Sequence, residues 1–405
     1  MTSTARVVVI GAGLAGVTLA RRLGELGTPA LVVGDEEHRP YNRVLLAEVL
    51  AGRFGPEVTA LPAPAALTRA RVTAIDRDRR TVRCADGTAI AYGTLVLATG
   101  SNAVLPPLRG LFTAERELPE GVHAFRTMDD CLALSKAVRP GMRAVVVGGG
   151  LLGVSAARAL AVRGARVVLA QQAERLMERR LDPAASALVR HHLEGLGVEV
   201  HTECRIRDVR TAGGAVRSVV PADGYVLGTD LVVLACGVRP RVGLARRAGL
   251  DVGTGVLVDG ELRTSDPHIR AVGDCAEHAG RVYGLAAPAL EQAGTLAALL
   301  AGSGTARYTG TRSLTRLTLT GPGRPFDLAA FGETDPRPGD HVVRLADATR
   351  GTYRKVVVRD DRLVGGVLVG ELGTVGALAR AWEGAEPLPS DGGPPLHLLT
   401  NDGGS

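Results

Sequence analysis

The sequence predicts an α/β fold in which two domains of alternating strands and helices precede a small α+β domain. A short apolar strand, a glycine-rich loop and a helix follow one another twice, in "RVVVIGAGLAGVTLA" at 6–20 and in "AVVVGGGLLGVSAARAL" at 144–160. Each passage leads into a further apolar strand, which completes a βαβ unit. After about residue 306 the pattern changes to short alternating strands with one helix. A chain of 405 residues has room for two or three such domains.

The first domain is predicted to carry a small β-meander inserted between two strands of its main sheet. Short alternating runs separated by a turn at Asp86-Gly87 are typical of antiparallel strands. This insertion makes the domain a Rossmann-like unit of the three-layer ββα type. The expected elements are a strand at 6–10, a helix at 14–26, a strand at 30–37 that ends in acids, the meander strands "RVTAID" and "TVRCADGTAIAY", and a strand "TLVLATG" at 94–100.

The second domain repeats this order, and the third has antiparallel texture. A Pro-, Gly- and Glu-rich segment at 101–125 indicates a linker before the second domain. The elements expected after it are a strand at 143–147, helices ending near 163 and spanning 183–196, strands at 165–170, 198–201 and 231–235, a strand, turn and strand at 255–277, and a helix at 288–301. In the third domain a helix is expected at 373–383, and the tail after it has a composition typical of disorder.

Composition excludes several classes of protein. With 45% hydrophobic and 22% charged residues the chain is an ordinary globular protein. The amino terminus lacks the pattern of a signal peptide, and the longest apolar runs, such as "LVVLACGV" at 231–238, are too short to cross a bilayer, so we expect a cytoplasmic protein without a membrane partner. The net charge of +6 suits a phosphate-rich cofactor or an acidic partner protein, but aromatic residues make up only 3%, so nucleic-acid binding has little support.

The five cysteines and the histidines do not form a metal or redox motif. Cysteines lie at positions 84, 131, 204, 236 and 275, without a CxxC or CxxxxC pair. This spacing favours neither a disulfide framework nor a zinc or iron–sulfur site. Five histidines, at positions 123, 191, 192, 268 and 278, have no metal-ligand spacing with other ligands, so we expect no metal site.

The first glycine loop, Gly11-x-Gly13-x-x-Gly16, predicts a dinucleotide site. The three glycines allow a tight turn, close approach of the backbone to a pyrophosphate and close helix packing, and the helix N-terminus then faces the phosphates. The pattern alone also occurs in turns without a ligand. Asp35 and Glu36 end the next strand, at the position where a carboxylate binds a ribose hydroxyl.

The second loop, Gly148-x-Gly150-x-x-Gly153, predicts the same chemistry without the acid. The strand after it ends in Gln171 and Gln172, so a preference for NAD over NADP is not enforced. Arg175 could bind a 2′-phosphate or could be a solvated surface charge; both interpretations stay open at this point.

Two loops of this kind indicate two dinucleotides, one a hydride donor and the other an acceptor that stays bound. Two further turns fit a flavin at the first loop. Thr99-Gly100 ends a strand beside the expected cleft, and Gly273-Asp274 ends another, where a carboxylate could accept hydrogen bonds from ribityl hydroxyls.

The order of these motifs resembles the FAD/NAD(P)H oxidoreductases of the pyridine-nucleotide-disulfide-reductase superfamily. Longer stretches are similar to the flavin half of the large subunit of assimilatory NAD(P)H nitrite reductase and to the nitrate reductase electron-transfer subunit: "RPYNRVLLAEVLAGR", "FRTMDD", "LMERRLDP", "RTSDPHIRAVGDCAEHAG" and "LVGGVLVGE". The resemblance implies FAD as cofactor, NAD(P)H as co-substrate and three domains. These are a discontinuous FAD domain at 1–115 and 245–305, an NAD(P)H domain at 116–244 and an α+β interface domain at 306–388, and a disordered tail at 389–405 follows them.

The resemblance also implies the residues of both sites. Those expected around FAD are Gly11, Gly13, Leu14, Ala15, Gly16, Asp35, Glu36, Arg43, Val72, Thr99, Gly100, Arg126 and Asp274. Those expected around the nicotinamide coenzyme are Gly148, Gly150, Leu151, Leu152, Gly153, Gln171, Arg175 and Gly237. No side-chain catalyst is expected, because hydride passes to the flavin directly.

Three departures from the related families shape the functional expectation. The iron–sulfur and sirohaem segments of full-length nitrite reductases are not in this sequence, so we expect no nitrite reduction by this chain alone. A redox cysteine pair is missing, and residues 42–48 hold no cysteine, which disfavours disulfide and peroxide chemistry. Glu48 and Ser155 stand where many ferredoxin and rubredoxin reductases carry a lysine and a glutamate; for Glu48 a surface helix position is the favoured interpretation.

The leading hypothesis is an NAD(P)H-dependent flavoprotein reductase that passes electrons through FAD to a separate redox protein in nitrate or nitrite assimilation. A ferredoxin or rubredoxin reductase is the alternative within the same class. A flavin-binding partner protein with incidental redox activity is the alternative from another class. The oligomeric state, including a homodimer, stays open.

Overall fold

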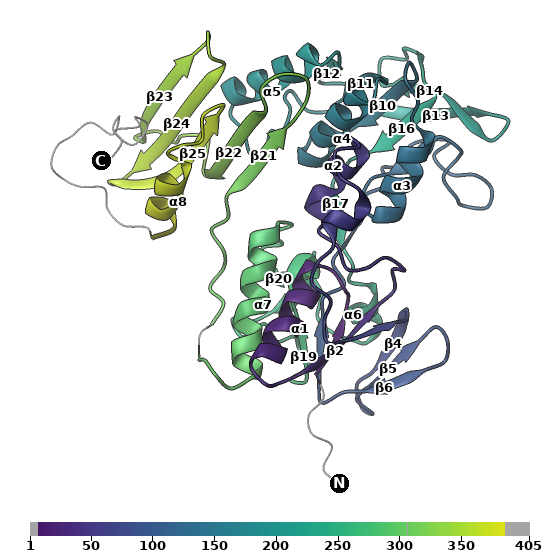
Figure 1. Ribbon diagram of the computed structural model, residues 1–405, viewed down its shortest axis with the longest axis vertical. Helices are drawn as coiled ribbons and strands as arrows, with labels where there is room; N and C mark the ends of the chain where they lie inside the picture. Colours follow the sequence, from purple (N-terminus) through teal and green to yellow (C-terminus); the bar gives the residue numbers. More distant parts are fainter. Residues whose placement is uncertain (1–6, 306, 385–405) are drawn as a thin grey trace. The chain divides into compact units, whose positions relative to one another are not determined.

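The computed structural model describes residues 7–305 and 307–384, which form two compact units. Of the described residues, the first unit holds 7–46, 54–103, 238–305 and 307–311, and the second holds 47–53, 104–237 and 312–384. Figure 1 shows the chain coloured by residue number, from purple near the amino terminus to yellow near the carboxyl terminus. The expected tail at 389–405 lies outside the described residues, and the division into three functional domains stays a prediction.

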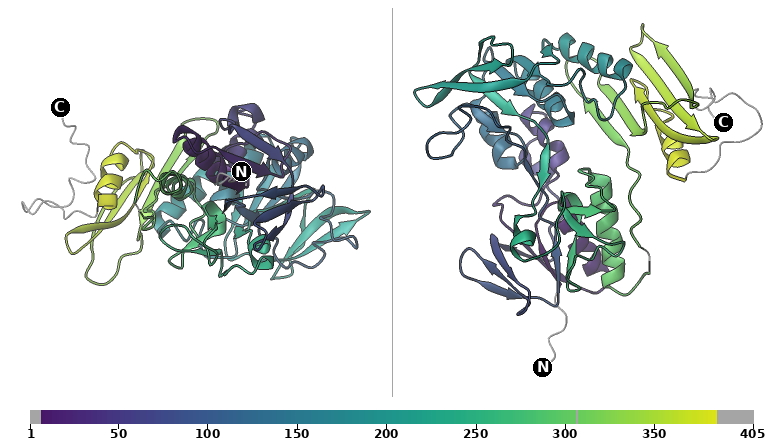
Figure 2. Two further views of the ribbon diagram at one scale, coloured as in Figure 1. Left: turned by 90° about the horizontal axis from the view of Figure 1, so that it is seen from below. Right: turned by 180° about the vertical axis from the view of Figure 1, so that it is seen from behind.

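The first unit is built on a five-stranded parallel sheet in the order β19-β7-β1-β2-β3. The middle strand, β1, is the uninterrupted apolar run Val7–Ile10, fully buried as expected of a parallel strand covered on both faces. On one face α1 and α7 lie side by side, visible in Figures 1 and 2, and pack against Val7 and Val9.

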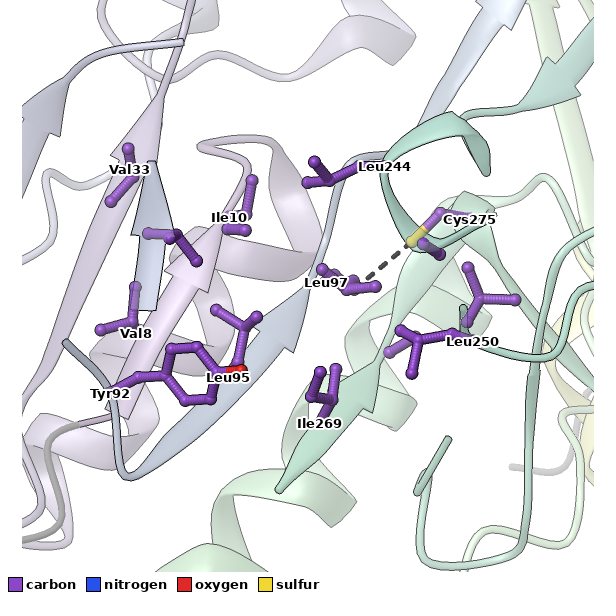
Figure 3. Close-up of a cluster of buried hydrophobic side chains, with 14 of the residues drawn as sticks. Val8, Ile10, Val33, Tyr92, Leu95, Leu97, Leu244, Leu250, Ile269 and Cys275 are labelled. Carbon is purple, nitrogen blue, oxygen red and sulfur yellow. Dashed lines mark hydrogen bonds between the residues drawn. The ribbon is translucent and has the colours of Figure 1, made fainter. Parts of the chain in front are cut away.

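The opposite face of this sheet is covered by the predicted meander. Val8 and Ile10 point to this side and contact Val82 and Ile90 of the three-stranded antiparallel sheet β4-β5-β6. Figure 3 shows Val8, Ile10, Leu95, Leu97 and Ile269 from the parallel strands in one apolar cluster. Helices, parallel sheet and meander make three layers, so the ββα type expected from the sequence is confirmed.

The elements of the first unit are β1 (Val7–Ile10), α1 (Leu14–Glu25), β2 (Ala30–Gly34), η1 (Arg43–Leu45), η2 (Pro56–Thr59), β3 (Ala66–Arg69), β4 (Val72–Asp76), β5 (Thr81–Cys84), β6 (Ala89–Ala91), β7 (Thr94–Leu97), β8 (Ser101–Ala103), β17 (Val238–Pro240), α6 (Gly243–Arg247), β18 (Val256–Val258), β19 (Ile269–Ala271), η3 (Gly273–Cys275), β20 (Ala276–His278) and α7 (Ala286–Leu300). The short helix α2 (Leu46–Leu50) begins at the boundary and belongs to the second unit from Ala47 onward.

The second unit repeats the parallel architecture and adds an antiparallel sheet from the carboxyl-terminal part. Its parallel sheet has the order β12-β11-β10-β16-β9, and the hairpin sheet β13-β14-β15 packs against it through Val145, Val219 and Val232. The second antiparallel sheet has the order β21-β22-β25-β24-β23. Phe331, Val356 and Trp382 belong to the apolar cluster that joins this sheet to α8.

The elements of the second unit are β9 (Val122–Ala124), α3 (Met128–Ala137), β10 (Arg143–Val147), α4 (Leu151–Val162), β11 (Arg166–Ala170), α5 (Pro183–Gly195), β12 (Glu199–His201), β13 (Ile206–Ala212), β14 (Ala215–Pro221), β15 (Leu227–Gly228), β16 (Leu231–Leu234), β21 (Thr315–Leu319), β22 (Phe326–Gly332), β23 (His341–Asp347), β24 (Thr352–Arg359), β25 (Arg362–Val369) and α8 (Val375–Gly384).

One sequence expectation about the fold is wrong. Residues 101–125 are more than a linker, because β8 pairs with β17 and β9 pairs with β16 at the edge of the parallel sheet. Both strands are only three residues long and lie among prolines and glycines. Such short edge strands have no periodic signal that composition could reveal.

Candidate functional site

The first glycine loop is a tight turn between β1 and α1 in the first unit. Gly11 has a φ of +117°, and a Cβ atom there would lie 2.1 Å from the Ala98 carbonyl oxygen. A Cβ at Gly16 would lie 2.0 Å from the Gly11 carbonyl oxygen, so helix and loop are in contact. At Gly13, the N-cap of α1, a Cβ would meet no atom within 4 Å, and no side chain caps the helix. The N-terminus of α1 therefore faces open space with free backbone donors, as an anion site requires.

A pocket of about 470 Å³ opens at the carboxyl ends of β2 and β3. Its lining residues are Asp35, Glu36, Glu37, Arg69, Ala70 and Arg71. Asp35 is exposed and has no side-chain partner among the described residues, so its carboxylate can accept hydrogen bonds from a ligand. Val72, another predicted contact, is half-buried at the start of β4, directly after the pocket's rim.

Glu36 and Arg43 are predicted as separate cofactor contacts, and the structure joins them. The Arg43 guanidinium forms an ion pair with the Glu36 carboxylate, and the Tyr41 hydroxyl donates to the same carboxylate at 2.6 Å. Arg43 also donates to the Tyr41 hydroxyl at 2.8 Å. Glu36 is thus occupied by two neighbours, whereas Asp35 and Glu37, both exposed, are available to a ligand. Tyr41 is a part of this site that the sequence analysis missed, although it stands two residues before Arg43.

The two other predicted turns meet at the same edge of the sheet. β7 and β19 are adjacent parallel strands, so Thr99 and Asp274 follow neighbouring carboxyl ends. The Ser101 hydroxyl donates to the Asp274 carboxylate at 3.0 Å, and the Thr99 hydroxyl donates to the Arg241 carbonyl at 3.0 Å. Ser101 was not predicted, although it directly follows the Thr-Gly turn.

Gln292 of α7 is a second residue that the sequence analysis missed. Its Oε1 accepts the Gly273 backbone N–H at 2.7 Å, and the side chain is 1% exposed. Gly273 has a φ of +77°, and a Cβ there would lie 2.9 Å from the Ala15 Cβ. Gln292 therefore fixes the turn that presents Asp274 beside the first turn of α1. A polar residue in an otherwise apolar helical stripe was the available signal.

The structure brings most of the predicted FAD contacts together at this carboxyl edge of the first unit. They are Gly11, Gly13, Leu14, Ala15, Gly16, Asp35, Glu36, Arg43, Val72, Thr99, Gly100 and Asp274. Arg126 is in the second unit, next to Thr127, the N-cap of α3, and its backbone N–H donates to the Asp130 carboxylate at 2.9 Å. The open helix N-terminus, the free Asp35 and the held Asp274 fit the pyrophosphate, ribose and ribityl groups of FAD.

The second glycine loop repeats this geometry in the second unit. Gly148 has a φ of +110°, and a Cβ there would lie 2.5 Å from the Ala235 carbonyl oxygen. Gly153 packs against Gly148 in the same way, while a Cβ at Gly150 would meet no atom within 4 Å. Leu151 and Leu152 form the first turn of α4, and Gly237 follows β16 on the neighbouring strand with a φ of +96°. The residues predicted around the coenzyme thus share one edge.

Gln171 closes this edge with its side chain. Its Oε1 accepts the Gly149 backbone N–H at 2.8 Å, and its Nε2 donates to the Arg175 carbonyl at 3.4 Å. The Met177 backbone N–H donates to the Gly149 carbonyl at 2.8 Å. The turn from Arg175 to Met177 therefore folds back onto the coenzyme loop.

Ser155 is a helix residue bonded to its own helix, and Glu48 takes part in a buried ion pair. The Ser155 hydroxyl donates to the Leu151 carbonyl at 2.8 Å. The Arg158 guanidinium, one turn along α4, pairs with the Glu48 carboxylate, and both contact Thr320 after β21. The expectation of a surface position for Glu48 is wrong, because its partner lies three residues beyond the position that alignment by motif suggested.

The cysteines are thiols with little tendency to ionise. Among the described residues all five are free. Burial raises the pKa of both Cys131 and Cys236 to about 11. In the described part of the chain, no group of three or more His, Cys, Asp or Glu side chains is arranged to hold a metal ion. The helices between residues 7 and 384 include none with the length and apolar character needed to span a bilayer.

Comparison with known proteins decides the family. The model of the pyridine nucleotide-disulphide oxidoreductase family matches residues 5–293. The chain belongs to this family. A second model, the rubredoxin NAD+ reductase C-terminal domain, matches residues 322–383, which hold β22 to β25 and most of α8. Membership confirms the expected fold class, the oxidoreductase assignment, and FAD with NAD(P)H as cofactor and co-substrate.

The similar proteins are reductases and electron-transfer subunits. The nitrite reductase [NAD(P)H] large subunit of Klebsiella oxytoca is 35% identical over 89% of this chain and 38% of its own length. The assimilatory nitrate reductase electron transfer subunit of Bacillus subtilis (strain 168) is 32% identical over 90% of this chain and 48% of its own length. The chain thus spans less than half of either relative. The putidaredoxin reductase in a covalent complex with putidaredoxin superposes with a TM-score of 0.85, at 27% identity, over 98% of this chain and 99% of that one.

Proposed function

We propose that this oxidoreductase transfers electrons from NAD(P)H through FAD to a separate redox protein in nitrate or nitrite assimilation, in the cytoplasm. The main support for the proposal is a difference between the two glycine loops. They share the same glycine spacing and turn geometry, but the residues after the next strand differ. The strand after the loop at Gly11 is followed by a free acid, Asp35, and the strand after the loop at Gly148 by an amide at the matching position, Gln172. Two loops with different ribose-facing residues suit two different dinucleotides.

The residues of the first unit would hold FAD. The amides at the N-terminus of α1 would bind the pyrophosphate, and Asp35 would accept a ribose hydroxyl. Asp274, held by Ser101, would accept hydrogen bonds from the ribityl chain. When bound, the flavin supplies the hydride-accepting and electron-passing chemistry.

The residues of the second unit would hold the nicotinamide coenzyme. The open N-terminus of α4 at Gly150 would bind its pyrophosphate. Gly237 leaves space at the end of the neighbouring strand for the backbone to approach the ligand closely. Positioning of two reactants supplies the catalysis in this proposal, so it assigns no acid or base among the side chains.

The nitrogen-assimilation acceptor is supported by the relatives' names and by nearly full coverage of this chain. The two relatives from Klebsiella oxytoca and Bacillus subtilis each match about nine-tenths of it. A ferredoxin or rubredoxin reductase is the second candidate. It is favoured by the match of residues 322–383 to the rubredoxin reductase C-terminal domain and by the rubredoxin-NAD(+) reductase of Pseudomonas putida, 34% identical over 67% of this chain.

The deciding experiment is anaerobic reduction of the purified, flavin-loaded protein. Added NADH or NADPH should bleach the flavin absorbance rapidly, and a colourless protein or an unreduced flavin contradicts the proposal. Steady-state turnover with acceptors then separates the two candidates. Acceleration of nitrate or nitrite reduction by the cognate reductase supports the first, whereas turnover only with a ferredoxin or rubredoxin supports the second.

A further inference from the structure

In the second unit, the residues that follow β11 lie beside the coenzyme loop, where the adenosine of the coenzyme would bind. They include arginine, and the ribose-binding acid of the first unit has no counterpart among them. The Gly148 N–H donates to the Ala170 carbonyl at 2.8 Å, as the Gly11 N–H donates to the Val33 carbonyl at 2.8 Å in the first unit. By this register Gln171 stands where the first unit carries Gly34, and Gln172 stands where it carries Asp35. The place of the Asp35 carboxylate is thus taken by the neutral, exposed side chain of Gln172.

Gln171 is held in an orientation that suits an anionic neighbour. It is 8% exposed, and its carbonyl oxygen accepts the Gly149 N–H at 2.8 Å. That bond turns the amide NH₂ away from the loop, toward the Arg175 carbonyl at 3.4 Å. A carboxylate at this place would repel a phosphate, whereas the amide adds no charge.

Arg175 is placed beside the loop with unused hydrogen-bonding capacity. A Cβ on Gly149 would lie 2.6 Å from Leu176 Cδ2, so the turn that starts at Arg175 is in contact with the loop. The Arg175 side chain is 27% exposed, and its Nε is buried without a hydrogen-bond partner. Buried donors are nearly always satisfied in native proteins, which points to a ligand acceptor at this guanidinium.

The acids near Arg175 do not neutralise it effectively. Glu174 and Asp335 approach its guanidinium only to 3.9 and 3.8 Å, beyond hydrogen-bond distance, and their side chains are 82% and 68% exposed. Exposed ion pairs of this kind contribute little. A third acid, Glu203, is exposed in the next turn, where its backbone N–H donates to the Ala173 carbonyl at 2.9 Å.

Two more cations follow in the same turn. Arg179 and Arg180 have no carboxylate within ion-pair distance in the described part of the chain. Both side chains are exposed. They add positive charge to this turn, which also carries the exposed Glu178.

We propose that this site takes NADPH in preference to NADH, with Arg175 binding the 2′-phosphate. The inference rests on the proposed function, in which this loop holds the reducing coenzyme. A guanidinium binds phosphate with two parallel N–H donors, so a contact of this kind is worth about 1.5–3 kcal/mol, or roughly a tenfold to hundredfold preference.

The test combines coenzyme kinetics with a binding measurement that needs no turnover. On the flavin-loaded enzyme, kcat/KM for NADPH should exceed that for NADH by about tenfold or more. By calorimetry, 2′,5′-ADP should bind about tenfold more tightly than 5′-AMP, from which it differs only by the 2′-phosphate. Arg175→Ala should remove both preferences, and Gln172→Glu, which places an acid at the position of Asp35, should reverse the kinetic one. Arg166→Ala, at the opposite end of β11, is the matched control and should change neither.

Equal or better use of NADH, equal binding of the two nucleotides, or a preference that survives Arg175→Ala would overturn the inference. An error in the proposed function itself would be seen in a different measurement, the reduction of the flavin. If neither coenzyme reduces the flavin, the reductase assignment falls, while the pair of nucleotides still tests the phosphate site directly.

Discussion

The Arg158 guanidinium of α4 and the Glu48 carboxylate of α2 form an ion pair away from solvent. Arg158 is 1% exposed, the Glu48 side chain is 15% exposed, and Thr320 accepts a hydrogen bond from Arg158 at 2.8 Å. Three segments distant in the sequence are joined at this point. The coenzyme helix, the segment after Arg43 and the carboxyl-terminal sheet therefore share one charged contact.

Removal of one member of this pair should be costly. Glu48→Gln leaves the Arg158 charge without its counter-ion, and loss of one partner of a buried pair costs about 3–5 kcal/mol. We expect the free energy of unfolding to fall by about 3 kcal/mol in urea titrations of the flavin-loaded protein. Glu25→Gln, which breaks an exposed pair with Arg21 on α1, should cost well under about 1 kcal/mol. Equal effects of the two variants would contradict the burial argument.

The Lys355–Asp182 pair should make the free energy of unfolding depend on pH in the acid range. Burial alone raises the pKa of Asp182, but hydrogen bonds from Lys355 and Tyr353 outweigh it, and the folded pKa is lowered. A lowered folded pKa contributes stability above the usual pKa of Asp, about 4, which is lost as pH falls through the folded value. The wild type should therefore lose stability in acid more steeply than Lys355→Met, measured by denaturation from pH 7 down to about 3.

Lysine occurs at only two positions, which provides the control for that experiment. Lys355→Met should destabilise the protein near neutral pH, because Asp182, 3% exposed, keeps its charge without a cation. Lys136→Met, at an exposed position in α3, should leave both the stability and its pH profile unchanged. A Lys355→Met protein with the wild-type acid profile would show that the pair does not set it.

Matched substitutions in the glycine loops should separate the two nucleotide sites. Both Gly13 and Gly150 have open space at the Cβ position, so valine fits the fold but fills the space of a pyrophosphate. Gly13→Val should yield folded protein without flavin colour. Gly150→Val should remain yellow but lose flavin reduction by NAD(P)H by about 100-fold or more, because two lost charge-assisted hydrogen bonds are worth at least about 3 kcal/mol. Absorbance spectra and stopped-flow traces measure the two effects. Loss of flavin colour in Gly150→Val instead of Gly13→Val would assign FAD to the second loop and the coenzyme to the first.

Gln292 should affect flavin retention from outside the loop. Gln292→Leu leaves the Gly273 N–H without its acceptor, at a cost of about 1–3 kcal/mol, and frees the turn that presents Asp274. We expect weaker FAD binding in dialysis and fluorescence titrations. Gln292→Glu retains an acceptor and should recover most of the affinity; if both variants bind FAD like the wild type, the turn does not depend on this bond.

Thiol reagents should leave the activity intact. With the pKa of Cys131 and Cys236 raised to about 11, the thiolate fraction at neutral pH is about 10⁻⁴ or less. N-ethylmaleimide at pH 7 should therefore leave flavin reduction unchanged over the time in which a free thiol reacts fully. If N-ethylmaleimide inactivates the protein rapidly, and one Cys→Ser variant is resistant, that cysteine takes part in the reaction and this prediction is wrong.

The sequence predicted local patterns well and long-range partners poorly. The glycine loops, the acid after β2 and the turns at Thr99 and Gly273 are contiguous motifs, so their elements could be predicted from spacing. Arg158 and Glu48 stand 110 positions apart, and no periodicity connects them. Side-chain partners such as Gln292 for Gly273 depend on the packing of α7 against α1, which only the folded chain defines.

The segment at 47–53 has a consequence for dissection of the protein. It belongs to the second unit, while the residues before and after it belong to the first. With the further changes of unit after residues 103, 237 and 311, neither unit corresponds to one uninterrupted stretch of the gene. Truncation at a single site therefore leaves incomplete cores on both sides of the cut. Circular permutation does not solve this, because it keeps the alternating order of the segments, and three segments would have to be rejoined for each unit.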